Sequence, residues 1–336
     1  MFIVDNYSLA VLFCFITMLC WGSWGNTQKL AGKTWRYELF YWDYAIGILV
    51  FAVIMAFTLG SIGDSGRGFL EDIKQADTAF LVSALIGGVI FNASNILLAA
   101  STSIAGLSVA FPLGVGLALV LGVFINYFST PKGDPVSLFL GVFLIVIAII
   151  LNGIAASKKT ADNKSDKNAK KGILLAAFAG ILMSFFYRFV AAAMDLDNFE
   201  QPAVGKITPY TAFFVFAIGV FLSNFVFNTI VMKKPFVGTP VTYKEYFSGT
   251  FSTHMVGVLG GCIWALGTLF SYIAAGKAGA AISYALGQGA PMIAAIWGIF
   301  IWKEFKGTSK TVNLLLTLMF ILFVCGLGLI VYAGRT

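Results

Sequence analysis

Charged side chains are scarce in this sequence, and their scarcity excludes whole classes of protein. Lys, Arg, Asp and Glu make up 11% of the 336 residues, whereas a soluble globular domain carries about 25%. The basic residues stand in short segments between long apolar runs, so they form no continuous basic face for a nucleic-acid backbone. We therefore expect neither a soluble domain nor a nucleic-acid-binding protein.

Metal-ligating and catalytic residue types are equally few. The chain has one histidine, His254, and one acid within a predicted helix, Asp43. Enzyme chemistry needs clustered titratable groups or a metal constellation. The four cysteines lie inside apolar runs without metal-ligand spacing or a disulfide framework; they are Cys14, Cys20, Cys262 and Cys325. We expect no metal, no cofactor and no catalytic activity.

Apolar residues, by contrast, are abundant, at 59% of the chain. A membrane-spanning helix needs about 20 of them in sequence, and ten segments qualify. The sequence therefore predicts an all-α, polytopic membrane protein. Its ten spans are residues 8–29, 39–60, 79–100, 104–128, 136–156, 172–194, 209–232, 252–275, 279–301 and 311–333.

Charge at the span boundaries predicts the orientation. The first apolar run follows Asp5 without a Lys or Arg, so we interpret it as a retained helix and not a cleaved signal peptide. With the N-terminus outside, 15 Lys and Arg fall in inner segments and 6 in outer segments, and basic residues favour the inner side. We expect a multi-pass protein of the plasma or inner cell membrane, with both termini outside.

The lysine-rich segment 157–171 divides the chain into two halves of five predicted spans, 1–156 and 172–336. Because five is odd, two related halves must lie in the membrane with opposite orientation. Carriers commonly use such inverted repeats and bind solute where the repeats meet. Shifting the sequence by 175 places lays residues 108–114 on 283–289 and matches Ser, Ala and Gly in order. Inverted repeats joined by a linker on the inner side are therefore predicted.

Several short stretches occur in an order shared with a known family: Asp43-Tyr44, Ser94-Asn95, Gly106–Val109, Asn126–Phe128, Tyr210–Phe214, Gln288, Pro291 and Trp297-Gly298. In these the chain resembles the ureide permease branch of the drug/metabolite transporter superfamily, which is related to glucose/ribose-type sugar transporters. The resemblance implies ten helices in two inverted halves. It also implies proton-coupled secondary transport of small polar solutes, chiefly ureides and nucleobases.

Two departures from the family keep other solutes open. The central segment is short and lacks the phosphate-binding-type motif that plant members carry there. Residues 21–29, Trp-Gly-Ser-Trp-Gly-Asn-Thr-Gln-Lys, are closer to the sugar-transporter relatives. A sugar uptake permease of the glucose, ribose or rhamnose type and a multidrug or metabolite exporter of the same fold remain alternatives. A channel is disfavoured, because the polar residues gather near the middle of the helices.

Two ionisable residues inside the predicted spans are candidates for transport chemistry. Asp43 lies about one turn from the inner end of the second span, where it is placed to carry a coupling proton or to pair with Arg36 or Lys33. Arg188 lies toward the outer third of the sixth span, where it either contacts an acceptor on the solute or extends outward. The sequence leaves both choices open.

Amides form two pairs, Asn92 with Asn95 and Asn224 with Asn228, each on one face of a helix. Amides donate and accept hydrogen bonds, which suits sugars, ureides and nucleobases. Bonding between neighbouring helices is the competing, favoured interpretation of both pairs.

Gly and Pro interrupt the ninth span around Gln288 and Pro291, and residues 111–116 offer a kink at the matching place of the first half. We expect the central cavity between these two kinks, with Gln288 in contact with solute.

Aromatic residues complete the predicted site. Trp21, Trp24, Trp264 and Tyr272 are candidates for flat walls around a ring-shaped solute, although Trp and Tyr also anchor helices at lipid interfaces. Trp264 lies in the middle of its span and Trp24 about a turn and a half from the inner end, which favours a cavity role for these two. The expected partners are a small polar solute, a coupling proton or sodium ion, and the lipid bilayer. The sequence leaves open whether the protein is a monomer or a homodimer.

Overall fold

The long apolar runs fold into helices, because away from water a backbone satisfies its N–H and C=O groups only within a helix or a closed barrel. The computed structural model describes residues 1–336 except 32–34, 64, 106, 161–168, 304 and 336. Every regular element in these described residues is helical. In chain order they are α1 (Tyr7–Ser23), α2 (Gly25–Leu30), α3 (Tyr37–Phe57), α4 (Phe69–Gln75), α5 (Thr78–Ala105), α6 (Leu107–Ser129), α7 (Pro135–Thr160), α8 (Ala169–Ala193), α9 (Pro209–Lys233), α10 (Tyr243–Phe247), α11 (Phe251–Ala278), α12 (Ala280–Gly287), α13 (Ala290–Ile296), the π-helical turn η1 (Trp297–Ile301) and α14 (Lys310–Ala333).

The predicted class, an all-α polytopic membrane protein, is confirmed. Among the described residues, nine helical stretches are long and apolar enough to cross a membrane. A tenth apolar stretch, Leu113–Ser129 of α6, is shorter than these nine. The count of ten therefore stays a prediction. Helices α7 and α8 extend into both ends of the segment 157–171, whose middle lies outside the described residues.

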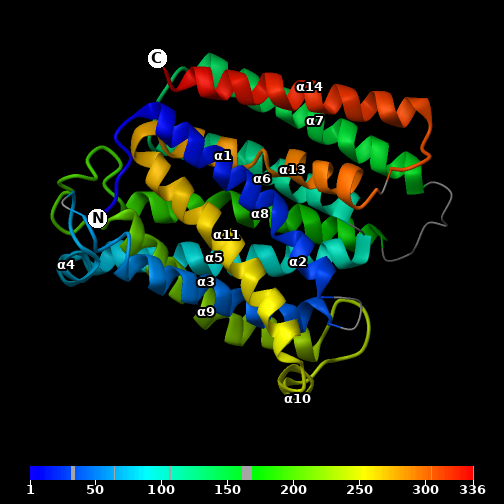
Figure 1. Ribbon diagram of the computed structural model, residues 1–336, viewed down its shortest axis with the longest axis horizontal. Coiled ribbons are helices and arrows are strands. Elements are labelled where there is room, and N and C mark those ends of the chain that lie inside the picture. The colour runs from blue at the N-terminus through cyan, green and yellow to red at the C-terminus, as the bar shows by residue number, and fades with distance from the viewer. Residues whose placement is uncertain (32–34, 64, 106, 161–168, 304, 336) are drawn as a thin grey trace.

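The helices run roughly alongside one another between two ends of the molecule (Figure 1). Helices α7 and α14 pack together on one side, α3 and α9 pack together on the other, and α5 and α8 pair between them. Both termini lie at the same end of the molecule as α4, here called the terminal end. Helices α2 and α10 lie toward the opposite end, here called the linker end because α7 finishes and α8 begins there.

Two helix crossings bring backbones into direct contact. Helices surrounded by lipid gain no hydrophobic energy from contacting each other, so small residues that permit close packing hold them together. A Cβ atom added to Gly261 of α11 would collide with the Tyr44 carbonyl of α3, and one added to Gly88 of α5 would collide with the Phe216 carbonyl of α9. The α3–α11 and α5–α9 crossings therefore both require glycine.

We predict that Gly88→Ala and Gly261→Ala each destabilise the protein by about 1–3 kcal/mol, the usual cost of overpacking. Gly328→Ala in α14 is the matched control, since a Cβ there has no neighbour within 4 Å and alanine favours a helix by about 1 kcal/mol over glycine. Thermal unfolding of the purified variants in detergent measures the difference. Equal midpoints for all three variants would contradict the close crossings.

Candidate functional site

A central chamber lies where the two halves of the chain meet. Its volume is about 30 Å³, room for a water molecule or two. Helices α1, α5 and α6 line it from the first half, and α8, α11 and the α12–α13 junction line it from the second. The lining residues are Trp21, Trp24, Phe91, Asn95, Leu98, Val115, Met183, Phe186, Trp264, Gln288 and Ala290.

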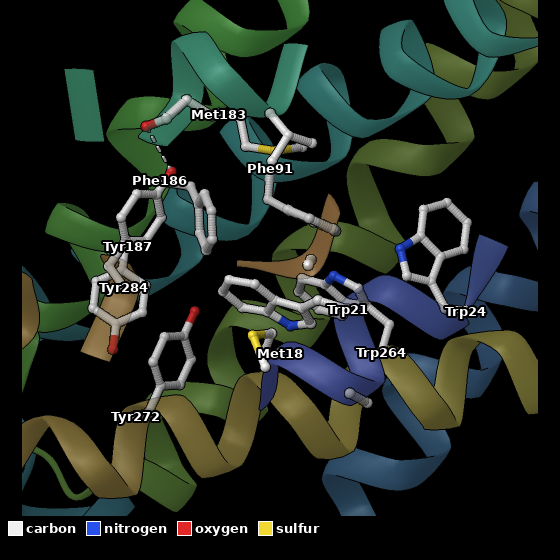
Figure 2. Packing of buried hydrophobic residues seen from close by; sticks show 14 of the residues in the cluster. Met18, Trp21, Trp24, Phe91, Met183, Phe186, Tyr187, Trp264, Tyr272 and Tyr284 are labelled. Atoms are coloured by element: carbon white, nitrogen blue, oxygen red, sulfur yellow. Dashed lines mark hydrogen bonds between the residues drawn. The ribbon is translucent and has the colours of Figure 1, made fainter. Parts of the chain in front are cut away.

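Aromatic rings form most of the chamber wall. The Trp264 ring stacks on Phe91 with 4.1 Å between centroids and lies nearly parallel to Trp21 at 6.2 Å. Figure 2 shows these rings together at the centre, with Trp24 to one side. Trp24 packs in turn on Tyr44 of α3 at 4.8 Å. Trp24 and Trp264 thus both line the chamber, and their contact with a solute stays a prediction.

Two amides supply the polar part of the described lining. Asn95 is buried, and its Nδ2 donates to the Tyr41 hydroxyl at 3.1 Å. Gln288 lies between the end of α12 and the start of α13, so the interruption expected in the ninth span is present. Helix α6, in contrast, runs unbroken from Leu107 to Ser129. The residues for which a matching kink was predicted, 111–116, lie within this continuous helix, so no break corresponds to the one at Gln288. The side chains of Phe111 and Pro112 lie outside the described ones.

The other predicted amides join helices away from the chamber lining. Asn92 Nδ2 donates to Ser223 Oγ at 2.9 Å and ties α5 to α9, while Asn228 Nδ2 donates to the Glu38 carbonyl at 2.8 Å and ties α9 to α3. Asn224 is fully buried, and neither of its amide atoms has a hydrogen-bond partner among the described residues. Neither Asn92 nor Asn224 is among the described residues that line the chamber.

The two ionisable candidates also lie off the chamber lining. Asp43 Oδ1 accepts a hydrogen bond from the Tyr246 hydroxyl at 2.6 Å and is 2.8 Å from His254 Nδ1. Arg36 pairs with Glu38 instead of Asp43, and the other expected partner, Lys33, lies outside the described residues. Glu38 is a second acid within the helical part of this span, because α3 begins at Tyr37, earlier than predicted.

Arg188 lies exposed on α8, in a separate groove beside the end of α6 that includes Asn126 and Thr130. It does not line the chamber. Position along a helix, which is what the sequence gives for Arg188, does not say which way the side chain faces.

A layer of tyrosines and serines closes the chamber toward the terminal end. The Tyr187 hydroxyl contacts Ser271 Oγ at 3.0 Å, Ser283 Oγ donates to the Ser271 carbonyl at 2.7 Å, and all three side chains are fully buried. Tyr272 and Tyr284 belong to the same layer, which clusters on one side of the Trp264 ring (Figure 2). Tyr272 thus contributes to the closure and not to the chamber wall.

A vestibule of about 340 Å³ opens on the other side, toward the linker end. Residues of α2, the end of α5 and η1 line it, among them Asn26, Thr102 and Gly298. Trp21 lines both the vestibule and the chamber, and its Nε1 donates to Thr268 Oγ1 at 3.0 Å. The Trp21 indole, one of the wall candidates from the sequence, therefore lies between the chamber and the vestibule.

Known proteins resemble this chain over nearly its whole length. The family model described as ureide permease matches residues 40–171 and 165–333. Ureide permeases 1 and 2 of Arabidopsis thaliana are each 23% identical, over 98% of this chain and 98% of each relative. "Probable glucose uptake protein GlcU" of Priestia megaterium is 25% identical, over 66% of this chain and 69% of the relative. One chain of known crystal structure shares the fold with a TM-score of 0.59 at 15% identity, covering 97% of this chain and 96% of that chain.

The tyrosine layer offers a matched pair of substitutions. The Tyr284 hydroxyl donates to the Ala118 carbonyl at 3.1 Å, whereas the Tyr272 hydroxyl is buried without a partner among the described residues. We predict that Tyr284→Phe lowers the free energy of unfolding by about 1 kcal/mol through the loss of this hydrogen bond, while Tyr272→Phe costs nothing. Thermal unfolding compares the two; a larger loss for Tyr272→Phe would show that its hydroxyl is bonded in solution.

Proposed function

Because the chain belongs to the ureide permease family, we propose that it is a secondary transporter that moves a small, planar, polar solute of the ureide or nucleobase class through the central chamber. Its place in the family and its apolar helices make it a multi-pass membrane transporter. The composition of the chamber wall supports the proposed class of solute.

The main support for this class of solute is the chamber wall, which consists of stacked aromatic rings with two amides at its edge. Trp264, Phe91 and Trp21 present flat faces, and stacking on an aromatic face contributes about 1–3 kcal/mol per ring for a flat heterocycle. Asn95 and Gln288 each offer one donor group and one acceptor group. A cyclic –CO–NH– edge, as in a ureide or nucleobase, presents the complementary pair. The wall therefore favours a flat solute with few polar edges.

Sugar transport is the second candidate, supported by the glucose uptake relative. A hexose carries five hydroxyls, and a buried hydroxyl without a partner costs about 1–3 kcal/mol. The described lining places two amides at the chamber, too few for that number of hydroxyls. An exporter of cationic drugs has no support in this lining, because none of its residues is acidic.

Alternating access requires an inward-facing and an outward-facing state. The proposed inverted repeat accounts for both, because one repeat can move against the other around a fixed site. Helices in corresponding positions begin at a nearly constant spacing: α3 and α9 at Tyr37 and Pro209, 172 positions apart, and α5 and α11 at Thr78 and Phe251, 173 apart. Helices α5 and α11 also have the same length, 28 residues. This agreement supports two related halves.

The chamber wall supports the repeat independently. Counted from the first residue of each helix, Phe91 of α5 corresponds to Trp264 of α11, its stacking partner. In the same way Trp21 and Trp24 of the α1 region correspond to Met183 and Phe186 of α8, and Val115 of α6 corresponds to Gln288 after α12. All eight line the chamber, as expected for a site on the axis between two inverted halves.

The direction in which the chamber opens follows from its two closures. Several buried tyrosines and serines block the terminal end, whereas Trp21 alone lines both the chamber and the vestibule at the linker end. We infer an inward-facing conformation in which Trp21 still separates the chamber from the vestibule, with the linker end on the cytoplasmic side, as the distribution of basic residues predicts.

We predict that Asn95→Ala and Gln288→Ala each raise the apparent KM for uptake about tenfold, since a lost solute hydrogen bond contributes about 1.4 kcal/mol. Radiolabelled uracil and allantoin uptake into proteoliposomes measures this, with glucose and ribose as competitors. Arg188→Ala, off the chamber, is the control and should keep the wild-type value. Competition by the sugars alone would favour the sugar permease, and unaltered affinity in both amide variants would place the solute elsewhere.

A further inference from the structure

We propose that Asp43 and His254 form the proton-binding site of the transport cycle, a latch outside the solute chamber that acts on the chamber through α3. This inference rests on the proposed transport function. The latch consists of Asp43 from α3, His254 from α11 and Tyr246 from α10, with Trp35 against them. It joins the first half of the chain to the second at the linker end.

The contacts in the latch are close and mutually supporting. Asp43 is 1% exposed. Its Oδ1 accepts a hydrogen bond from the Tyr246 hydroxyl at 2.6 Å and lies 2.8 Å from His254 Nδ1. Tyr246 and Trp35 stand edge-on to the imidazole, with ring centroids at 4.8 and 5.2 Å. Added Cβ atoms on Gly249 and Gly257 would collide with His254 and Asp43, so glycine permits this packing.

The arrangement identifies where a proton enters. A carboxylate oxygen accepts hydrogen bonds, so His254 Nδ1 carries a hydrogen toward Asp43 and Nε2 takes the exchangeable proton. The His254 side chain is 22% exposed and that of Asp43 is 2% exposed, so water reaches the imidazole and not the carboxylate. Burial, followed by the hydrogen bond to Asp43, raises the pKa of Tyr246 above its ordinary value, and the phenol stays a donor throughout.

Other charged groups on the packed elements are engaged elsewhere or exposed. Arg36 and Glu38 at the start of α3 pair with each other. On α10, the Glu245 carboxylate accepts from the Thr242 backbone N–H in a capping box, and Lys244 is exposed. The charge that faces Asp43 in the described latch is therefore the one that the His254 imidazole carries when both of its ring nitrogens are protonated.

Helix α3 connects the latch to the chamber. Tyr44, adjacent to Asp43, packs on both Trp24 and Trp264 of the chamber wall, with centroids at 4.8 and 6.4 Å. Tyr41, two residues before Asp43, accepts the hydrogen bond from Asn95. A change in the contact between Asp43 and His254 of α11 would therefore move α3 against two rings of the chamber wall, Trp24 and Trp264. Through Tyr41 it would also affect Asn95, one of the two amides of the solute site.

The terminal end carries a corresponding contact that does not titrate. There Asp72 of α4 pairs with Arg67 at 3.0 Å and accepts the backbone N–H of Thr208, which caps α9, at 2.8 Å. Helix α4 holds the start of α9 as α10 holds the start of α3, but guanidinium keeps its charge at every physiological pH. A proton therefore acts on the linker end alone.

A measurement without solute tests the latch itself. The Asp43–His254 ion pair is present while the imidazole is protonated, so the thermal midpoint of the wild type should fall by about 2–4 °C between pH 6 and pH 8. The glutamine in His254→Gln can still donate a hydrogen bond to Asp43 but carries no charge. In this variant and in Asp43→Asn, the thermal midpoint should no longer decrease between pH 6 and pH 8. Asp72→Asn, the matched control at the terminal end, should lower the midpoint equally at both pH values. A His254→Gln variant that retains the wild-type fall overturns the latch.

A transport measurement then tests coupling. In proteoliposomes with radiolabelled uracil, the ratio of accumulation driven by a pH gradient to uptake by counterflow should drop at least tenfold in His254→Gln and Asp43→Asn and stay at the wild-type value in Asp72→Asn. A wild type that carries neither uracil nor allantoin in counterflow counts against the proposed function, and the thermal measurement still decides the latch. Accumulation driven by a sodium gradient and indifferent to pH overturns the proton site.

Discussion

The chamber depends on two of the crossings at which helix backbones touch. Lipid offers no hydrophobic reward for helix association, so the α3–α11 and α5–α9 crossings rest on the absence of a side chain at Gly261 and Gly88. Phe91 and Trp264 each follow one of these glycines by three residues, about one turn along the same face. The crossings therefore bring the two stacked rings of the chamber together, and the solute site is a direct product of the packing.

The class of protein is well predicted by the sequence, because a run of about twenty apolar residues is typical of a membrane-spanning helix and rare elsewhere. The register of the two halves is poorly predicted. A single shift of 175 lays Ser108 on Ser283, whereas the starts of α6 and α12, at Leu107 and Ala280, are 173 apart. The starts of α1 and α8, at Tyr7 and Ala169, are 162 apart. Because loop lengths differ between the proposed halves, no single gapless shift aligns all the helix pairs: a shift of 173 lays Phe91 on Trp264, whereas Trp21 falls on Met183 only at a shift of 162.

The residues that line the chamber differ in how visible they are in the sequence. Asn95, Gln288, Trp24 and Trp264 were found because a polar group or an indole in mid-membrane is conspicuous. Met183 and Phe186 carry no such signal, since apolar residues are ordinary in a span, and only their positions on α8 reveal that they complete the wall. Asn92 and Asn224 carry the same signal as Asn95 yet lie off the chamber lining, because an amide is equally useful between helices and helix periodicity does not say which neighbour a face meets.

The two ends of the molecule use the same architecture with different chemistry. A short helix, α4 or α10, reaches from one half to the beginning of the second spanning helix of the other, and a buried carboxylate joins them. If both contacts were permanent ion pairs, the protein would respond equally to any pH at its two ends. Placing an arginine at one contact and the single histidine of the chain at the other removes that equality. A site that is nearly symmetric in its walls can then be biased in one direction, because the asymmetry lies in the contacts that hold its helices and not in the groups that meet the solute.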